Sequence, residues 1–215
     1  MRFSATLTVL AAISGLVVSG CVSGTNSPDS DQSLLGKGLD SFSGLVGRSK
    51  QQRSDELIGA GVDAVTTAEA NPYMDQLEKQ LNSELKDDQT SVVRAGNQII
   101  LSISSASLFE PNQNRLRRAA LDQLNKIAAI LQKNDRTTVD VYGYTDAGGD
   151  EKKNLELTQT RALAVARHLA GQGVDTRRLS VTGFGSSRPV EPNDTDSGRV
   201  KNRRIEIQIS AVKRK

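Results

Sequence analysis

An aspartate and an arginine in the second half of the sequence are the residues whose types and spacing point most clearly to chemistry. Asp146 lies just past residues 138–143, whose alternating apolar and polar side chains predict a half-buried strand. Gly148 and Gly149 allow an open loop, and Arg161 lies about two turns into the helix expected next. A carboxylate and a guanidinium held close together bind the two charges of a zwitterion. We therefore expect a zwitterion receptor at Asp146 and Arg161, with a surface salt bridge as the alternative.

Catalytic and metal chemistry have little support in this sequence. His168 is the only histidine and Cys21 the only cysteine, so there is no Ser/His or Cys/His pair and no zinc cluster. We expect His168 on the solvent side of a helix. No phosphate-binding or dinucleotide-binding loop is present. The sequence predicts a protein that is not an enzyme and has no catalytic residues, metal or cofactor. A formal charge of +3 over a mixed surface does not indicate a nucleic-acid partner.

Cys21 stands at the end of a segment typical of secretion. Residues 1–20 carry an early arginine, an apolar run and a small-residue end, which predicts a signal peptide. Val18-Ser19-Gly20-Cys21 resembles the lipobox of bacterial lipoproteins, and the resemblance implies acylation of Cys21 and cleavage before it. By the same resemblance, Val22 in place of aspartate favours the outer membrane, with the protein facing the periplasm. An ordinary signal peptide with an incidental cysteine is the alternative.

Residues 21–70 are rich in small and polar side chains and are expected to form a tether. Three short apolar patches with glycines lie within it, and a flexible linker is favoured over packed helices. Asn71-Pro72 is a good helix start, so residues 71–97 are expected to hold a short amphipathic helix and a lead-in strand. The last residues, 212–215, form a basic tail that is expected to be a solvated terminus.

Residues 98–211 have the pattern of one compact α/β domain. The composition, with 36% hydrophobic residues and 3% aromatic ones, predicts a single modest core. Strands and helices alternate as βαβαβ(α)β, so we expect an α+β two-layer sandwich with a mixed sheet and helices on one side. The expected strands are 98–103, 138–143, 179–183 and 204–209, and the expected helices include residues 116–131 and 155–169.

This domain carries a set of motifs whose combined spacing is specific. They are Val141-Tyr142-Gly143-Tyr144-Thr145-Asp146, Leu157-Thr158-Gln159-Thr160-Arg161-Ala162, Gly183-Phe184-Gly185, Gly198-Arg199 and Asn202-Arg203-Arg204-Ile205-Glu206-Ile207. Together they closely resemble the OmpA-like peptidoglycan-binding domain, which is shared with the Pal lipoproteins and the stator proteins of flagellar motors. The resemblance covers roughly residues 98–211. With the lipobox and the helix near Tyr73, the chain looks most like the YiaD-type lipoproteins of this group.

The resemblance implies a ligand and a set of contacts. The ligand is the free end of diaminopimelate in the peptidoglycan stem peptide, whose ammonium Asp146 would hold and whose carboxylate Arg161 would hold. Asn154 would hydrogen-bond the ligand, and Gly148 would donate its backbone N–H. Arg203 would offer a second cation to a peptide carboxylate. In the segment Phe109-Glu110-Pro111-Asn112, Asn112 would line the rim of the ligand site, while Phe109 is expected in the core.

Three positions depart from the family pattern. Tyr144 stands where many relatives have histidine, Thr158 replaces a common serine, and Glu110 replaces the usual aspartate. None of these changes touches Asp146 or Arg161. The sequence therefore predicts an outer-membrane lipoprotein that binds peptidoglycan and tethers membrane to wall. The alternative is an envelope assembly or secretion accessory, whose residues 30–90 bind another protein while wall binding only positions it.

Overall fold

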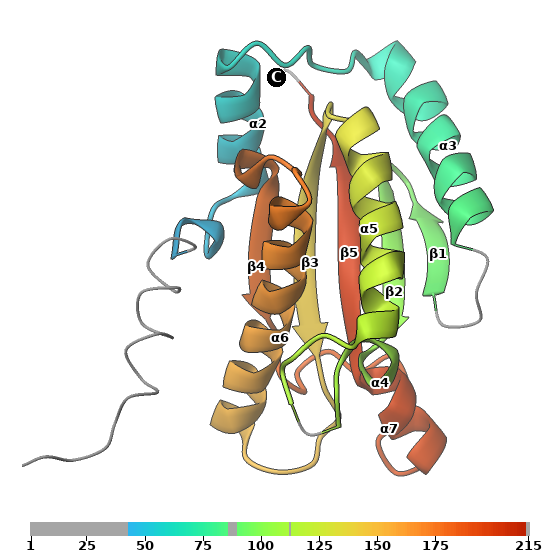
Figure 1. Cartoon of the computed structure of the whole chain (residues 1–215), viewed down its shortest axis with the longest axis vertical. Helices are drawn as coiled ribbons and strands as arrows, with labels where there is room; N and C mark the ends of the chain where they lie inside the picture. Colours follow the sequence, from blue (N-terminus) through green and yellow to red (C-terminus); the bar gives the residue numbers. More distant parts are fainter. Residues whose placement is uncertain (1–42, 86–89, 112, 214–215) are drawn as a thin grey trace, which may run out of the picture.

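The computed structural model describes residues 43–85, 90–111 and 113–213. A five-stranded mixed sheet forms its centre, in the order β1-β2-β5-β3-β4, with β3 and β4 parallel and the other pairs antiparallel (Figure 1). The strands are β1 (Thr90–Ala95), β2 (Gln98–Ser104), β3 (Thr137–Tyr144), β4 (Leu179–Gly183) and β5 (Arg204–Ala211). The helices are α2 (Lys50–Gly59), α3 (Thr67–Glu84), α4 (Ser105–Leu108), α5 (Arg118–Lys133), α6 (Glu151–Gly171) and α7 (Asp196–Asn202), with 3₁₀ turns η1 (Ser43–Leu45) and η2 (Thr176–Arg178).

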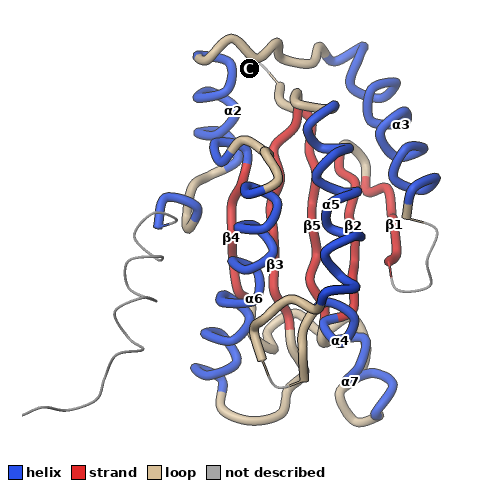
Figure 2. Tube along the Cα trace, viewed as in Figure 1, coloured by secondary structure: helices blue, strands red, loops and turns tan. Residues whose placement is uncertain are grey.

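The core lies between one face of the sheet and α5 and α6, which cross it side by side (Figure 2). Antiparallel pairing sets Val139 opposite Ile209 and Val141 opposite Ile207, so the apolar residues of neighbouring strands share one face. Leu124 and Val165, from the two helices, are fully buried against that face. The predicted mixed-sheet fold is confirmed.

Helix α2 corrects two expectations. Residues 43–59 were expected to belong to the tether, and all helices were expected to cover the same side of the sheet. Ser49 and Gln52 form a capping box at its start, and Arg53 and Leu57 are buried. Arg53 pairs with Asp140, and Lys50 Nζ donates to Ser210 Oγ over 2.9 Å. Asp140 and Ser210 alternate with the core residues of β3 and β5, so α2 packs on the opposite face of the sheet.

The start predicted for the helix before the domain is also wrong. Helix α3 begins at Thr67 instead of Asn71-Pro72, because Thr66 and Glu69 form a capping box there, and Pro72 lies inside the helix. Leu77 and Leu81 are fully buried, as their spacing predicts. In the described residues, no helix is long and apolar enough to cross a membrane.

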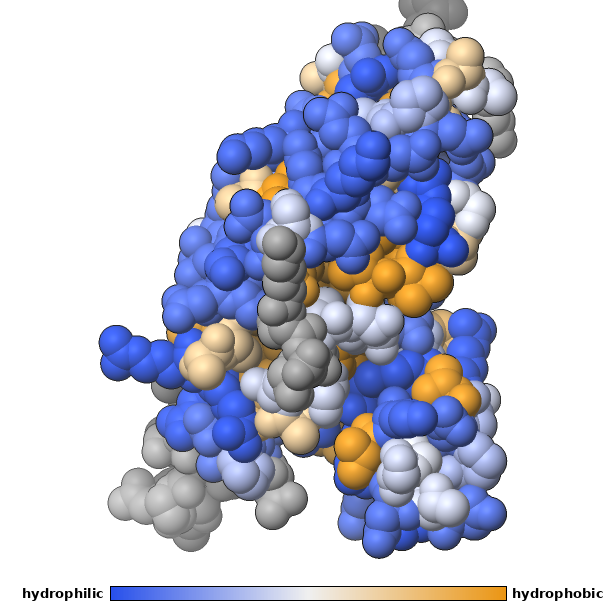
Figure 3. All heavy atoms as spheres, turned by 90° about the vertical axis from the view of Figure 1, so that its right-hand side faces the viewer, coloured by the Kyte–Doolittle hydropathy of each residue, from blue (hydrophilic) through white to orange (hydrophobic). Residues whose placement is uncertain are grey.

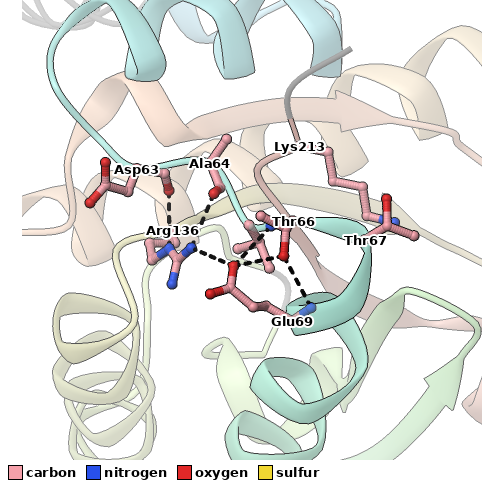
Figure 4. Close-up of a pocket in the computed structure, with 8 residues that line it drawn as sticks. Asp63, Ala64, Thr66, Thr67, Glu69, Arg136 and Lys213 are labelled. Atoms are coloured by element: carbon pink, nitrogen blue, oxygen red, sulfur yellow. Dashed lines mark hydrogen bonds and ion pairs between the residues drawn. The ribbon is translucent and has the colours of Figure 1, made fainter.

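The connection from α2 to α3 is fastened to the end of the sheet where the C-terminus lies (Figure 1). Arg136 donates to the backbone oxygens of Asp63 and Ala64 over 3.0 and 3.1 Å and lies 3.4 Å from the Glu69 carboxylate (Figure 4). The Val65 amide donates to the Val212 carbonyl over 2.7 Å. These bonds hold residues 60–66 against the domain.

The outward face of β1 and β2 carries an apolar groove that α2 does not reach. Its lining includes Val93, Val190 and Val200, whose exposed fractions are 52%, 55% and 47%. Apolar side chains appear among hydrophilic ones on the side of the molecule seen in Figure 3. The two faces of the sheet therefore differ, one being sealed by α5 and α6 and the other only partly covered.

Candidate functional site

Two glycines place the start of α6 beside the end of β3. Gly143 and Gly183 are register partners on the parallel strands β3 and β4. A Cβ atom at Gly143 would lie 2.2 Å from the Thr158 carbonyl oxygen, and one at Gly183 would lie 2.4 Å from the Gln159 nitrogen. Only glycine permits so close a contact between helix and strand. The Thr158 hydroxyl accepts a 3.0 Å hydrogen bond from the Gly185 amide. Threonine in place of the common serine therefore keeps a hydroxyl that links α6 to the loop after β4.

The loop between β3 and α6 presents the Asp146 carboxylate. Gly148 donates its amide to Asp146 Oδ1 over 2.9 Å, and Asn154 Nδ2 donates to the Gly148 carbonyl over 2.8 Å. Gly149 has a φ of 83°, which favours glycine. From the neighbouring loop, Asn193 Oδ1 accepts from the Ala147 amide over 3.2 Å. These contacts fix the loop, with Asp146 beyond the carboxyl end of a strand, where α/β sheets offer ligands a crevice.

The cation paired with Asp146 is Arg203. Its guanidinium Nη1 bonds Asp146 Oδ2, and the two side chains are 39% and 16% exposed. Burial of Asp146 acts to raise the pKa of its carboxyl group. Hydrogen bonds from Arg203 and from the Gly148 amide outweigh that effect, so this pKa lies below its ordinary value. Asp146 is therefore held as a carboxylate at the rim.

Arg161 lies nearby but is only lightly bound. Its Nη2 donates to the Gln113 carbonyl over 3.3 Å, and its guanidinium carbon lies 5.1 Å from the centre of the Phe109 ring. Its Nε is buried and has no hydrogen-bond partner among the described residues. Burial, together with the positive charge of Arg203, lowers the pKa of Arg161. Arg161 thus presents unused donors beside a second guanidinium, which is an arrangement that attracts a carboxylate.

A pocket of about 270 Å³ opens between α4, α6 and the segment before α5. Arg161 and Arg203 both line it, and Asp146 lies just beyond Arg203. The basic side chain of Arg117 also lines it, a residue that the sequence reasoning did not single out. Only its position directly before the helix at 118 could have suggested a role. The remaining lining residues are Ser105, Ala106, Phe109, Glu110 and Pro111.

The structure brings most of the predicted site residues together, with differences in detail. Asp146, Gly148, Asn154 and Arg203 form one hydrogen-bonded group. Arg161 joins it through its proximity to Arg203, and among the described residues Arg161 makes no hydrogen bond or ion pair with Asp146. The Gly148 amide was expected to donate to a ligand but donates to Asp146 instead. The Asp146 side chain accepts a hydrogen bond from the amide two residues later, as aspartate does in turns, and this bond satisfies the Gly148 amide within the protein. Asn112 lies outside the described residues.

Three residues near the site have structural roles. Phe109 is 2% exposed, which confirms that it belongs to the core. Tyr144 stacks on Phe184 at 5.3 Å, with Arg204 over its ring at 3.9 Å. His168 keeps partial contact with solvent, and a ring nitrogen lies 2.8 Å from Asn125 Oδ1 in an exposed contact between α6 and α5. Across the described ranges, no group of three or more His, Cys, Asp or Glu side chains could hold a metal ion.

Comparison with known proteins agrees with this architecture. The family model described as "OmpA family" matches residues 108–203. The chain is 35% identical over 212 residues to "Probable lipoprotein YiaD" of Escherichia coli K12, covering 95% of this chain and 97% of that protein. It is 38% identical over 109 residues to "Outer-membrane lipoprotein YfiB" of Pseudomonas aeruginosa, covering 51% of this chain and 65% of that protein.

Among solved structures, the cell wall anchor of the T6SS from Pseudomonas aeruginosa superposes with a TM-score of 0.57 at 29% identity. That match covers 63% of this chain and 96% of the anchor. The lipoprotein from Escherichia coli is matched over nearly its whole length, and the family model spans the segment that carries Asp146, Arg161 and Arg203. The chain therefore belongs to the OmpA family.

Proposed function

We propose that this protein is an outer-membrane lipoprotein that binds peptidoglycan non-covalently through the diaminopimelate of the stem peptide. One observation carries the proposal. At the rim of the sheet, the Asp146 carboxylate is paired with the partly exposed Arg203, beside an Arg161 with unused donors. A ligand with an ammonium and a carboxylate on one carbon offers both complementary charges to this group.

In the proposed complex, the ligand ammonium binds Asp146 and its carboxylate binds Arg161 through two parallel hydrogen bonds. Arg203 yields part of its bond to Asp146 and turns toward a peptide carboxylate. Asn154 and Gly148 hold the loop, and Asn154 Oδ1 accepts from the ligand, while Asn112 completes the rim. The exchange of one cation for another at Asp146 has a small cost, because both side chains reach solvent and the ligand ammonium replaces the positive charge that leaves.

The other end of the proposed function is Cys21, which lies outside the described residues. Its lipobox and the names of two relatives, a probable lipoprotein and an outer-membrane lipoprotein, support acylation. Several acyl chains on one residue give stable anchoring. Weak affinity for a single stem peptide is then sufficient, because a membrane-tethered domain meets a dense lattice of ligands at high effective concentration. Membrane and wall are thereby tied together without a covalent bond.

Sedimentation with purified peptidoglycan tests the wall contact. The Asp146→Ala and Arg161→Ala variants should remain in the supernatant while keeping the circular dichroism spectrum of the parent protein. Asp175→Ala and Arg177→Ala serve as matched controls, because these residues form a surface ion pair outside the proposed site. Both controls should sediment like the parent. If the two site variants still sediment with the wall, the assigned site is wrong.

The anchor is tested separately in cells. Labelled palmitate should be incorporated into the parent protein and not into Cys21→Ser, and only the parent should co-fractionate with outer membranes. Equal labelling of both proteins would refute the lipobox assignment. A non-enzymatic role predicts in addition that no soluble muropeptides are released when the purified protein is incubated with walls.

The alternative is an assembly accessory that binds another envelope protein. Its predicted partner contact lies in residues 30–90, and the apolar groove lined by Val93, Val190 and Val200 offers a further surface for a protein partner, since exposed apolar patches mark interaction sites. Deleting residues 30–70 is not a clean test, because it would also remove Arg53 and Leu57 from the interior. Deleting residues 30–42 removes none of the residues that the structure describes. Loss of a cross-linked partner with wall binding retained would support the accessory role.

A further inference from the structure

The pocket beside the zwitterion site contains more positive charge than that site uses. Arg117, Arg161 and Arg203 line it, against a single carboxylate, Glu110. In the proposed complex Arg161 holds the carboxylate of the zwitterion, and Arg203 is shared between Asp146 and a peptide carboxylate. Arg117 is the cation that remains. An uncompensated guanidinium in a small pocket favours an anionic group of the ligand.

The geometry of Arg117 suits such a role. Its Nε donates to the Phe109 carbonyl over 2.7 Å, which fixes the plane of the guanidinium. Among the described residues, no hydrogen bond or ion pair occupies its two Nη atoms. Its backbone amide donates to the Leu108 carbonyl over 2.9 Å, so the residue is also anchored through the main chain. A guanidinium that is fixed through its Nε and has both Nη groups available is preorganised to bind a carboxylate.

A second feature of the pocket also points to a ligand. Ser105 is 5% exposed, its hydroxyl has no hydrogen-bond partner among the described residues, and it lines the pocket. Its amide donates to the Arg203 carbonyl over 2.9 Å, so its position relative to that arginine is fixed. A buried hydroxyl without a partner costs free energy unless something bonds to it. A carboxylate oxygen entering the pocket would satisfy it.

We propose that this pocket is a second carboxylate subsite, in which Arg117 and Ser105 bind a carboxylate of the wall peptide next to the zwitterion. The inference rests on the proposed function, because Asp146 and Arg161 must first hold the diaminopimelate end. The group it selects is the α-carboxylate of the glutamate that precedes diaminopimelate in the stem peptide. The subsite therefore makes the protein discriminate between walls in which that carboxylate is free and walls in which it is amidated.

Calorimetric titration of the purified full chain in detergent tests this with three probes. They are free meso-diaminopimelate, the tripeptide L-alanyl-γ-D-glutamyl-meso-diaminopimelate, and the same tripeptide with the glutamate α-carboxylate amidated. A charged hydrogen bond corresponds to about a tenfold change in affinity. The parent protein should bind the free tripeptide about tenfold more tightly than the amidated one. Because this comparison changes only the ligand, it holds whatever a substitution does to folding.

Variants locate the discrimination. Arg117→Gln should bind both tripeptides equally, with unchanged affinity for free diaminopimelate, and Arg117→Lys should recover part of the preference. Arg118→Gln, which removes the neighbouring charge outside the pocket, should discriminate like the parent. Equal binding of both tripeptides by the parent, or a preference retained in Arg117→Gln, would overturn the subsite and leave the zwitterion site standing. If Asp146→Ala binds free diaminopimelate as the parent does, the proposed function fails instead.

Discussion

Two aspartate–arginine pairs in this molecule have the same chemistry and opposite surroundings. Arg53 and Asp140 meet between α2 and the sheet, where their side chains are 1% and 5% exposed. Arg203 and Asp146 meet at the rim, with 39% and 16% exposed. The Arg53 guanidinium also donates to the carbonyls of Val139 over 3.2 Å and Arg178 over 2.6 Å. The interior arginine is thus bound on several sides by the protein itself.

The difference in burial determines which ion pair can exchange partners. Separating the interior pair would leave a charge buried without compensation, which costs several kcal/mol. Water can solvate either member of the rim pair, and Arg161 beside it has donors to spare. A ligand ammonium can therefore replace Arg203 on Asp146, whereas Asp140 is closed off by α2, whose Lys50 lies 3.9 Å away on its other oxygen. The interior pair fixes α2 on the domain, and the rim pair is available for recognition.

Removing the interior cation should have the largest effect. We expect Arg53→Met to lower the free energy of unfolding by about 3–5 kcal/mol, because Asp140 stays buried and loses its hydrogen-bonded partner, keeping only Lys50 at 3.9 Å. Urea unfolding followed by circular dichroism measures this. Arg177→Met is the matched control, since it breaks a pair with Asp175 whose side chains are 47% and 33% exposed. That control should lose less than about 1 kcal/mol.

A double variant sharpens the same prediction. Replacing Asp140 by leucine together with Arg53→Met removes both buried charges, and it should recover most of the lost stability. If Arg53→Met unfolds at the urea concentration of the parent, the interior pair contributes nothing and α2 is held by its apolar contacts alone. The two pairs would then not differ in their contribution to stability.

The rim pair should show the smaller response. We expect Arg203→Met to change the free energy of unfolding by about 0–1 kcal/mol, because both partners reach solvent. The same urea measurement applies, and peptidoglycan sedimentation should weaken in the same variant. A loss of stability as large as that of Arg53→Met would mean that Arg203 is a structural residue and that Asp146 is not free to exchange partners.

How much the sequence predicts also differs between the two pairs. The motif around Asp146 and Arg161 lies on elements with clear periodicity, so the strand, the helix and both residues are predictable. Apolar alternation likewise predicts β2, β3 and β5. Arg53, in contrast, lies in a polar stretch that reads as tether. Its burial depends on Asp140, which is 87 residues further along the chain, and local patterning carries no information on such a contact.

Other differences have similar physical causes. Arg203 and Asp146 are separated by 57 residues, so their pairing could not be inferred from spacing, although each was a candidate. The true start of α3 was readable, since Thr66 and Glu69 have the capping-box spacing. Asn71-Pro72 is a competing start signal, and it favours a helix that begins too late. Proline is favoured at the first helical position but does not define it, because tertiary packing can extend a helix beyond it.

Acid titration should give the smallest and most specific difference. The folded pKa of Asp146 lies below its ordinary value of 3.8, because the bonds from Arg203 and Gly148 outweigh the opposing effect of burial. The unfolded chain therefore binds this proton first as the pH falls. The pair's contribution to stability is present above about pH 4 and is lost as the pH drops through the folded pKa.

Titration of the Asp146 carboxyl carbon by NMR measures this pKa directly. In Arg203→Met the pKa should rise toward 3.8, since burial then acts against only the Gly148 bond and the charge of Arg199. Arg177→Met should leave it unchanged. An Asp146 pKa that does not move in Arg203→Met would contradict the pairing at the rim. Because a carboxylate that stays charged through mildly acidic conditions can still hold an ammonium, wall binding by the parent should persist from neutral pH down to about pH 5.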